Sequence, residues 1–138
     1  MAESEQEIAA ATRRGPGRIL ITVYAIFALA ATARSLVQIA TKFSEAPLAF
    51  LLSALAGVIY IVATVSLIRG DRASRKVAKI AISIELAGVV LVGTASLLFP
   101  HSFPAATVWS GFGSGYGFVP LVLPFFGLWW LRRTDSPA

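Results

Sequence analysis

The stretch from Ala46 to Ile68 carries no charged side chain. It exceeds the about 20 apolar residues that a helix needs to cross the hydrocarbon core of a bilayer. Three further apolar blocks of similar length are separated from it by short polar strips, and they cover about residues 19–40, 77–99 and 109–131. This pattern predicts an all-α protein, an integral membrane bundle of four helices.

Composition supports a chain solvated by lipid and argues against several kinds of chemistry. Of the 138 residues, 57% are hydrophobic and 14% are charged, whereas a soluble domain has about 45–50% and about 25%. The chain has no cysteine and a single histidine, His101, which excludes thiolate sites and a multi-histidine metal site within one chain. It also has no Ser/His/Asp set and no closely spaced pair of carboxylates. We therefore expect no cofactor and no enzymatic activity.

The lysines and arginines predict the orientation of the bundle. With four spans, three basic strips share one side of the membrane and only Lys42 remains on the other. The positive-inside rule then puts both termini in the cytoplasm of a multi-pass cell-membrane protein. The net charge of +5 is explained by this orientation and by anionic lipid headgroups, so we expect no nucleic-acid partner. The strips contain Arg13, Arg14, Arg18, Arg69, Arg72, Arg75, Lys76, Lys79, Arg132 and Arg133.

The chain divides into a mobile N-terminal tail (1–17), a four-span transmembrane domain (18–133) and a C-terminal tail (134–138). The acidic start indicates a mobile or weakly helical segment, and "RRGPGR" then breaks any helix because Pro16 stands between two glycines. A competing interpretation is a cleavable signal peptide, since basic residues and an apolar run precede "ATA". Cleavage after Ala33 would leave three spans and an outside N-terminus.

Two ionisable residues, Glu85 and Arg34, fall deep inside the apolar blocks, whereas Lys79 lies near the start of its block. A charge near the bilayer centre costs at least about 2.5–3.5 kcal/mol. At about 1.5 Å per residue, Glu85 lies roughly 12 Å and Arg34 roughly 22 Å from the cytoplasmic ends of their helices. The gap of about 10 Å leaves a direct Arg34–Glu85 pair open. Without that pair, Arg34 would reach outer headgroups or a polar cleft, and Glu85 would be protonated or contact a neighbouring helix.

Glu85 has a functional and a structural interpretation. As a functional group it would handle protons or cations, and as a structural group it would fix the packing of two helices. Arg34 begins a polar stripe on one helical face, which continues through Gln38, Thr41, Lys42 and Glu45. The candidate intramembrane polar site therefore comprises Glu85, Arg34 and Gln38.

The segment "WSGFGSGYGFVPLVLP" (109–124) concentrates glycine at the outer side, at Gly111, Gly113, Gly115 and Gly117. It contains neither GxGxxG nor a following GK[ST], so it does not predict a phosphate-binding loop. One interpretation is GxxxG helix packing. The other is irregular backbone that enters from the outer surface before a shorter helix begins near Val119. Trp109 is expected near the outer interface and His101 in an exposed outer loop.

Two stretches carry a resemblance, "VYAIFALAATARSLVQIATKFSEAPLAF" (23–50) and "TVWSGFGSGYGFVPLVLPFFGLWWLRR" (107–133). Together they resemble small integral membrane proteins of actinobacteria. The resemblance covers nearly all of the chain beyond residue 17. It implies a four-helix membrane protein, and it implies neither an activity nor any catalytic residue.

Three classes of function remain open. The sequence favours a structural or accessory subunit that packs against itself, as a homo-oligomer, or within a larger membrane complex. The alternative is a small oligomeric transporter or channel in which Glu85 and Arg34 line the path. An intramembrane enzyme or a lipid-binding protein is the third. A transport pathway predicts that both residues face water, whereas a structural role predicts that both are dry and paired.

Overall fold

The computed structural model describes residues 4–103 and 105–134, which form helices and short connections without any strand. This confirms the all-α prediction for the described residues. Of the predicted C-terminal tail (134–138), only Thr134 lies among them. The α-helices are α1 (Glu5–Arg13), α2 (Pro16–Lys42), α3 (Pro47–Arg69), α4 (Arg72–Leu98) and α5 (Val119–Arg133), and the 3-10 helices are η1 (Phe43–Glu45), η2 (Pro100–Ser102) and η3 (Ser110–Tyr116).

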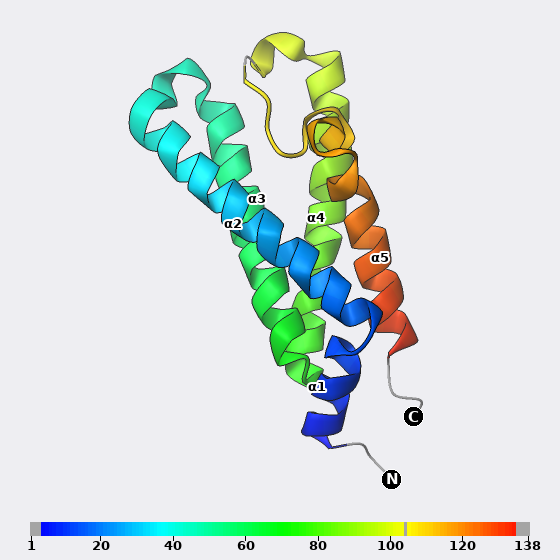
Figure 1. Ribbon diagram of the computed structural model, residues 1–138. Helices are drawn as coiled ribbons and strands as arrows, with labels where there is room; N and C mark the ends of the chain where they lie inside the picture. Colours follow the sequence, from blue (N-terminus) through cyan, green and yellow to red (C-terminus); the bar gives the residue numbers. More distant parts are fainter. Residues whose placement is uncertain (1–3, 104, 135–138) are drawn as a thin grey trace.

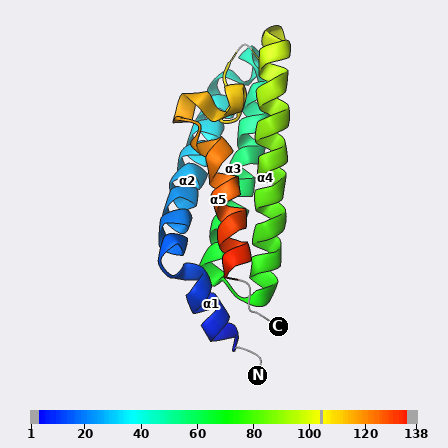
Figure 2. The same ribbon diagram turned by 90° about the vertical axis from the view of Figure 1, so that its right-hand side faces the viewer.

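The helices α2 to α5 lie side by side in one bundle (Figure 1). The α3–α4 link and the end of α5 lie at the same end of this bundle as α1, and the α2–α3 turn lies at the opposite end (Figures 1 and 2). Among the residues that the structure describes, three helical segments are long and apolar enough to cross a membrane: Pro16–Glu45, Pro47–Arg69 and Arg72–Leu98. A fourth is added if η3 and α5, which are bent by 95° relative to each other, are counted as one span.

The boundary between α3 and α4 follows from local chemistry. Gly70 ends α3 in the left-handed conformation, and its N–H donates to the carbonyl of Ser66. Asp71 then caps α4, because its carboxylate accepts a hydrogen bond from the N–H of Ser74 at 2.8 Å. The hydrogen bonds from Ser74 hold the pKa of Asp71 below its usual range. The cap fixes the point at which the chain turns back into the bundle.

The prediction of one continuous span over 109–131 is wrong. Residues 110–116 form η3, in which Gly111, Phe112 and Gly113 have positive φ angles. The GxxxG interpretation of the four glycines is therefore also wrong, because a regular helix cannot contain such residues. The alternative is confirmed: an irregular segment precedes a helix that begins at Val119. With 15 residues, α5 is about 22 Å long, which is shorter than a hydrocarbon core of about 30 Å.

The irregular segment is fitted closely against the bundle. Gly113 has a φ of +82°, and a Cβ at this position would come within 2.8 Å of the Pro120 ring. On the facing surface of α4, a Cβ on Gly88 would come within 2.6 Å of the Trp109 indole. The absence of a side chain at Gly88 therefore allows the aromatic ring of Trp109 to approach α4 closely.

The N-terminal segment predicted to be a mobile or weakly helical tail instead contains a packed helix. The side chains of Ile8 and Thr12 on α1 are buried against the end of the bundle. Ser4 caps this helix by accepting a hydrogen bond from the N–H of Glu7. The expected break is real, since α1 ends at Arg13 and α2 begins at Pro16. The break redirects the chain without ending its contact with the other helices.

Candidate functional site

Glu85 lies near the middle of α4 and is completely buried. The equally buried Tyr24 on α2 donates a hydrogen bond from its hydroxyl to Glu85 Oε1 at 2.6 Å. Glu85 Oε2 has no hydrogen-bond partner among the described residues, although a carboxylate can accept about four hydrogen bonds. This Tyr24–Glu85 contact, which we term the interior pair, joins two helices with a single hydrogen bond.

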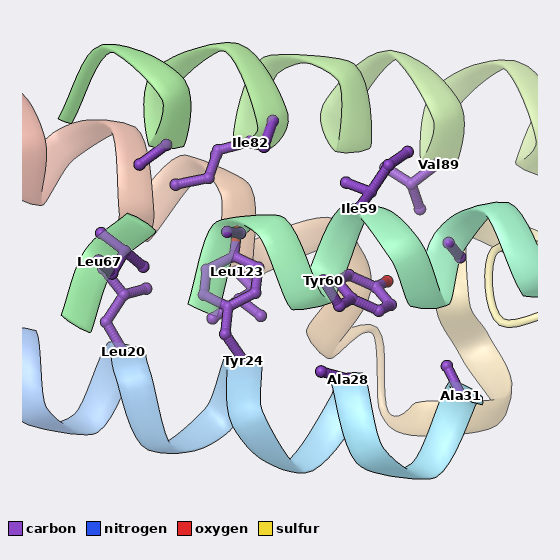
Figure 3. Close-up of a cluster of buried hydrophobic side chains, with 14 of the residues drawn as sticks. Leu20, Tyr24, Ala28, Ala31, Ile59, Tyr60, Leu67, Ile82, Val89 and Leu123 are labelled. Atoms are coloured by element: carbon purple, nitrogen blue, oxygen red, sulfur yellow. The ribbon is translucent and has the colours of Figure 1, made fainter. Parts of the chain in front are cut away.

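A row of aromatic side chains extends from the interior pair. Figure 3 shows Tyr24 of α2 and Tyr60 of α3 among the buried side chains between the helices, and their ring centroids lie 6.1 Å apart. The Tyr60 hydroxyl accepts a hydrogen bond from Trp109 Nε1 at 2.9 Å, and the two rings meet edge to face. Trp109 is only 2% exposed, so its side chain lies inside the bundle, and its expected position near the outer interface stays a prediction. Its N–H finds a partner inside the bundle.

Arg34 makes a different contact from the one considered in the sequence. It is exposed on α2, and its guanidinium Nη1 donates to the hydroxyl of Tyr116 at 2.5 Å. The Tyr116 ring in turn packs against Phe27, with centroids 5.8 Å apart. Arg34 therefore connects α2 to η3.

The structure does not gather the predicted polar residues into one site. The hydrogen bond of Glu85 comes from Tyr24 and that of Arg34 goes to Tyr116, so the direct Arg34–Glu85 pair does not form. Gln38 is buried, whereas Arg34 is exposed, although the two are one helical turn apart. His101 is exposed in η2, as expected.

A second polar cluster, which we term the basal cluster, lies where α1 meets the other helices. Arg75 is only 6% exposed. Its Nη1 donates to Thr12 Oγ1 at 2.7 Å and to Thr134 Oγ1 at 2.9 Å, and its Nη2 donates to the carbonyl of Leu131. The carbonyl of Thr12 accepts from Trp130 Nε1 at 2.8 Å. The cluster thus joins α1, α4 and α5.

Sequence reasoning missed the partners in both clusters. Arg75 was one of ten basic residues used to orient the chain, and nothing in its neighbourhood distinguishes it from Lys76. Tyr24 left a weak signal, because it shares a helical face with Leu20, Ala28 and Ala31, all of which are buried. That periodicity indicates which face of α2 meets the core, and a hydroxyl on that face needs a partner.

Comparison with protein families, with curated proteins and with solved structures finds no match. The resemblance to small actinobacterial membrane proteins therefore stays a prediction. Within residues 4–103 and 105–134, no group of three or more His, Cys, Asp or Glu side chains is arranged to hold a metal ion. The function of the chain is therefore inferred from the interior pair, the basal cluster and the surface of the bundle.

Proposed function

We propose that the chain is a multi-pass membrane protein of the cell membrane with both termini in the cytoplasm. Its apolar helices present large side chains outward, including Leu29 at 74% and Leu91 at 68% exposure. Surfaces of this kind suit lipid and are costly in water. In four passes the chain returns to the side on which it started. This agrees with the position of α1 and the end of α5 at one end of the bundle (Figure 1). The three basic strips belong to this end, and the positive-inside rule therefore assigns it to the cytoplasm.

Within the membrane, we propose that the protein is a structural or accessory subunit. The observation that carries this proposal is the complete burial of Glu85 and its hydrogen bond to Tyr24. A group that moves protons or cations needs access to water in at least one state. The interior pair instead holds α2 against α4 in a closed core, which is the arrangement expected of a packing contact.

The alternative of a small oligomeric transporter or channel requires Glu85 and Arg34 to line a common path. Their hydrogen bonds go to different residues, and only Arg34 is exposed. Glu85→Gln distinguishes the two proposals because it removes the ionisable group and keeps the size of the side chain. A transporter would lose proton-dependent flux, whereas a structural subunit would change mainly in thermal stability or in recovery of its complex.

An accessory subunit is expected to leave its native membrane together with a partner. The measurement is purification in a mild detergent from cells that express the chain at its natural level, followed by mass determination of the intact assembly. We expect a defined complex, either a homo-oligomer or a hetero-complex of fixed stoichiometry, and we expect Glu85→Gln to form a complex of the same composition, with any change confined to its thermal stability or its recovery. Recovery of both forms as monomers alone would contradict the accessory role.

A further inference from the structure

The arginine-rich break between α1 and α2 borders a groove that neither the interior pair nor the basal cluster uses. The groove has a volume of about 830 Å³, and its lining includes Arg13, Arg14, Arg18, Ile21 and Ile68. It therefore lies between residues of α1, the break, α2 and the last turn of α3. Concave sites of about 300–1,000 Å³ are large enough for a small organic ligand.

The cationic side chains that line the groove are Arg13, Arg14 and Arg18, which lie in and beside the break between α1 and α2. Arg14 and Arg18 are exposed. Arg13 is anchored, because its Nη1 donates to the carbonyl of Ile68 at 2.7 Å. Each guanidinium has five N–H donors in a planar fork that suits phosphate oxygens. The "RRGPGR" break keeps these residues together, since α1 ends at the first arginine and α2 starts at Pro16.

The apolar wall of the groove belongs to the surface that faces lipid. On α2 the charge of Arg18 is followed at once by Ile19, which is 62% exposed, and on α3 the 47% exposed Ile68 is followed by Arg69. On both helices, the change from apolar to charged side chains therefore falls at the groove, since Arg18, Ile21 and Ile68 all line it. An occupant must carry a negative charge at one end and hydrocarbon at the other.

We propose that this groove binds one anionic phospholipid, with its phosphate against Arg14 and Arg18 and the first part of an acyl chain along Ile21 and Ile68. The proposal rests on the membrane location argued above, but it is independent of the accessory role. An anionic glycerophospholipid satisfies both halves of the groove, whereas a soluble phosphate satisfies only the arginines. Basic residues near a bilayer surface are known to attract such headgroups.

Photo-crosslinking of the purified full chain in a neutral detergent tests this proposal. The probe is phosphatidylglycerol with a diazirine close to the ester of one acyl chain, and the control lipid is phosphatidylcholine with the same chains and label. We expect crosslinks on peptides that contain Ile21 or Ile68, with phosphatidylglycerol saturating at a lower concentration. Excess glycerol phosphate is expected to leave the yield unchanged, because it lacks the hydrocarbon that contacts the apolar wall.

A matched pair of variants separates a site from general surface charge. R14Q/R18Q removes two exposed arginines of the groove, and R72Q/K76Q removes two exposed cations at the same end of the bundle that do not line it. At about 1 kcal/mol for each basic residue, we expect R14Q/R18Q to raise the half-saturating lipid concentration roughly thirtyfold. We expect R72Q/K76Q to change it less than about twofold, because exposed charges at a distance are screened.

Three results would overturn the lipid site. They are equal crosslinking of the two lipids, equal losses in the two double variants, and full competition by glycerol phosphate. Unchanged unfolding midpoints in R14Q/R18Q would show that any loss comes from the groove and not from unfolding. Because the assay uses the isolated chain in detergent, its outcome does not depend on whether a partner copurifies.

Discussion

Replacing Tyr24 with Phe is expected to destabilise the bundle by about 2–3 kcal/mol, because it removes the hydrogen-bond donor to a buried carboxyl. The ring is kept, so the contact with Tyr60 at 6.1 Å remains and no large cavity forms. Glu85 would then keep neither of its oxygens hydrogen-bonded, since Oε2 already has no partner among the described residues. The measurement is the free energy of unfolding in mixed detergent micelles.

Two further variants show whether this loss belongs to the interior pair. Tyr116→Phe also deletes a phenolic oxygen, but its partner Arg34 is exposed, so we expect a loss below about 1 kcal/mol. Y24F/E85L removes both members of the pair, and we expect it to recover to within about 1 kcal/mol of the parent because no buried group is left unpaired. Equal losses for Tyr24→Phe and Tyr116→Phe would show that the interior pair does not hold α2 against α4.

Arg75→Leu is expected to cost about 3 kcal/mol of unfolding free energy, since it leaves several buried acceptors without a donor. The carbonyl of Leu131 lies in the last turn of α5 and has no later turn of the helix to supply a donor. Thr12 and Thr134 lose the same guanidinium. The docking of α1 should weaken together with the end of α5.

Lys76→Leu is the matched control for Arg75→Leu. It removes the same charge from the next residue of α4, but Lys76 is exposed, so we expect a change within about 0.5 kcal/mol. Arg75→Lys should recover only part of the loss, because an ammonium cannot reproduce the planar fork of donors. Limited proteolysis after Arg13 or Arg14 provides a second measurement, and faster cleavage in Arg75→Leu alone would confirm that α1 has been released. Equal stability of Arg75→Leu and Lys76→Leu would contradict a structural role for the basal cluster.

The hydropathy of the chain was sufficient to predict three of the long helices closely. The uncharged stretch from Ala46 to Ile68 becomes α3 at Pro47–Arg69, because a helix satisfies every backbone group within one apolar segment. The same measure failed for residues 109–118. Phe112 and Phe118 count as apolar, yet both have positive φ angles, which a regular helix does not contain. Average hydropathy carries no information on backbone conformation.

Of the candidate site, the sequence predicted the interior position of Glu85 but not its contacts. Depth counting identified Glu85 as an interior residue, and it left a pair with Arg34 open because the two residues differ in depth by about 10 Å. The observed donor is Tyr24, a residue 61 positions away in sequence that hydropathy treats as part of the apolar block. The N-terminal segment shows the same difficulty, since Thr12 is buried through contacts with Gly70, 58 positions later. Local composition does not encode such contacts.

Single cysteines can locate each end of the bundle relative to a membrane, because the natural chain has no cysteine. Ser4→Cys and Lys76→Cys mark the end that contains α1, whereas Ser44→Cys and Ser102→Cys mark the opposite end, and all four parent residues are exposed. The reagent is a membrane-impermeant maleimide, applied to intact cells and then to permeabilised cells.

We expect Ser44→Cys and Ser102→Cys to be labelled in intact cells, and Ser4→Cys and Lys76→Cys only after permeabilisation. Loss of the Ser4→Cys label under both conditions, together with a shortened chain, would instead indicate cleavage after Ala33. Labelling of Ser4→Cys and Lys76→Cys on opposite sides of the membrane, or of all four positions in intact cells, would contradict a four-pass bundle with both ends in the cytoplasm.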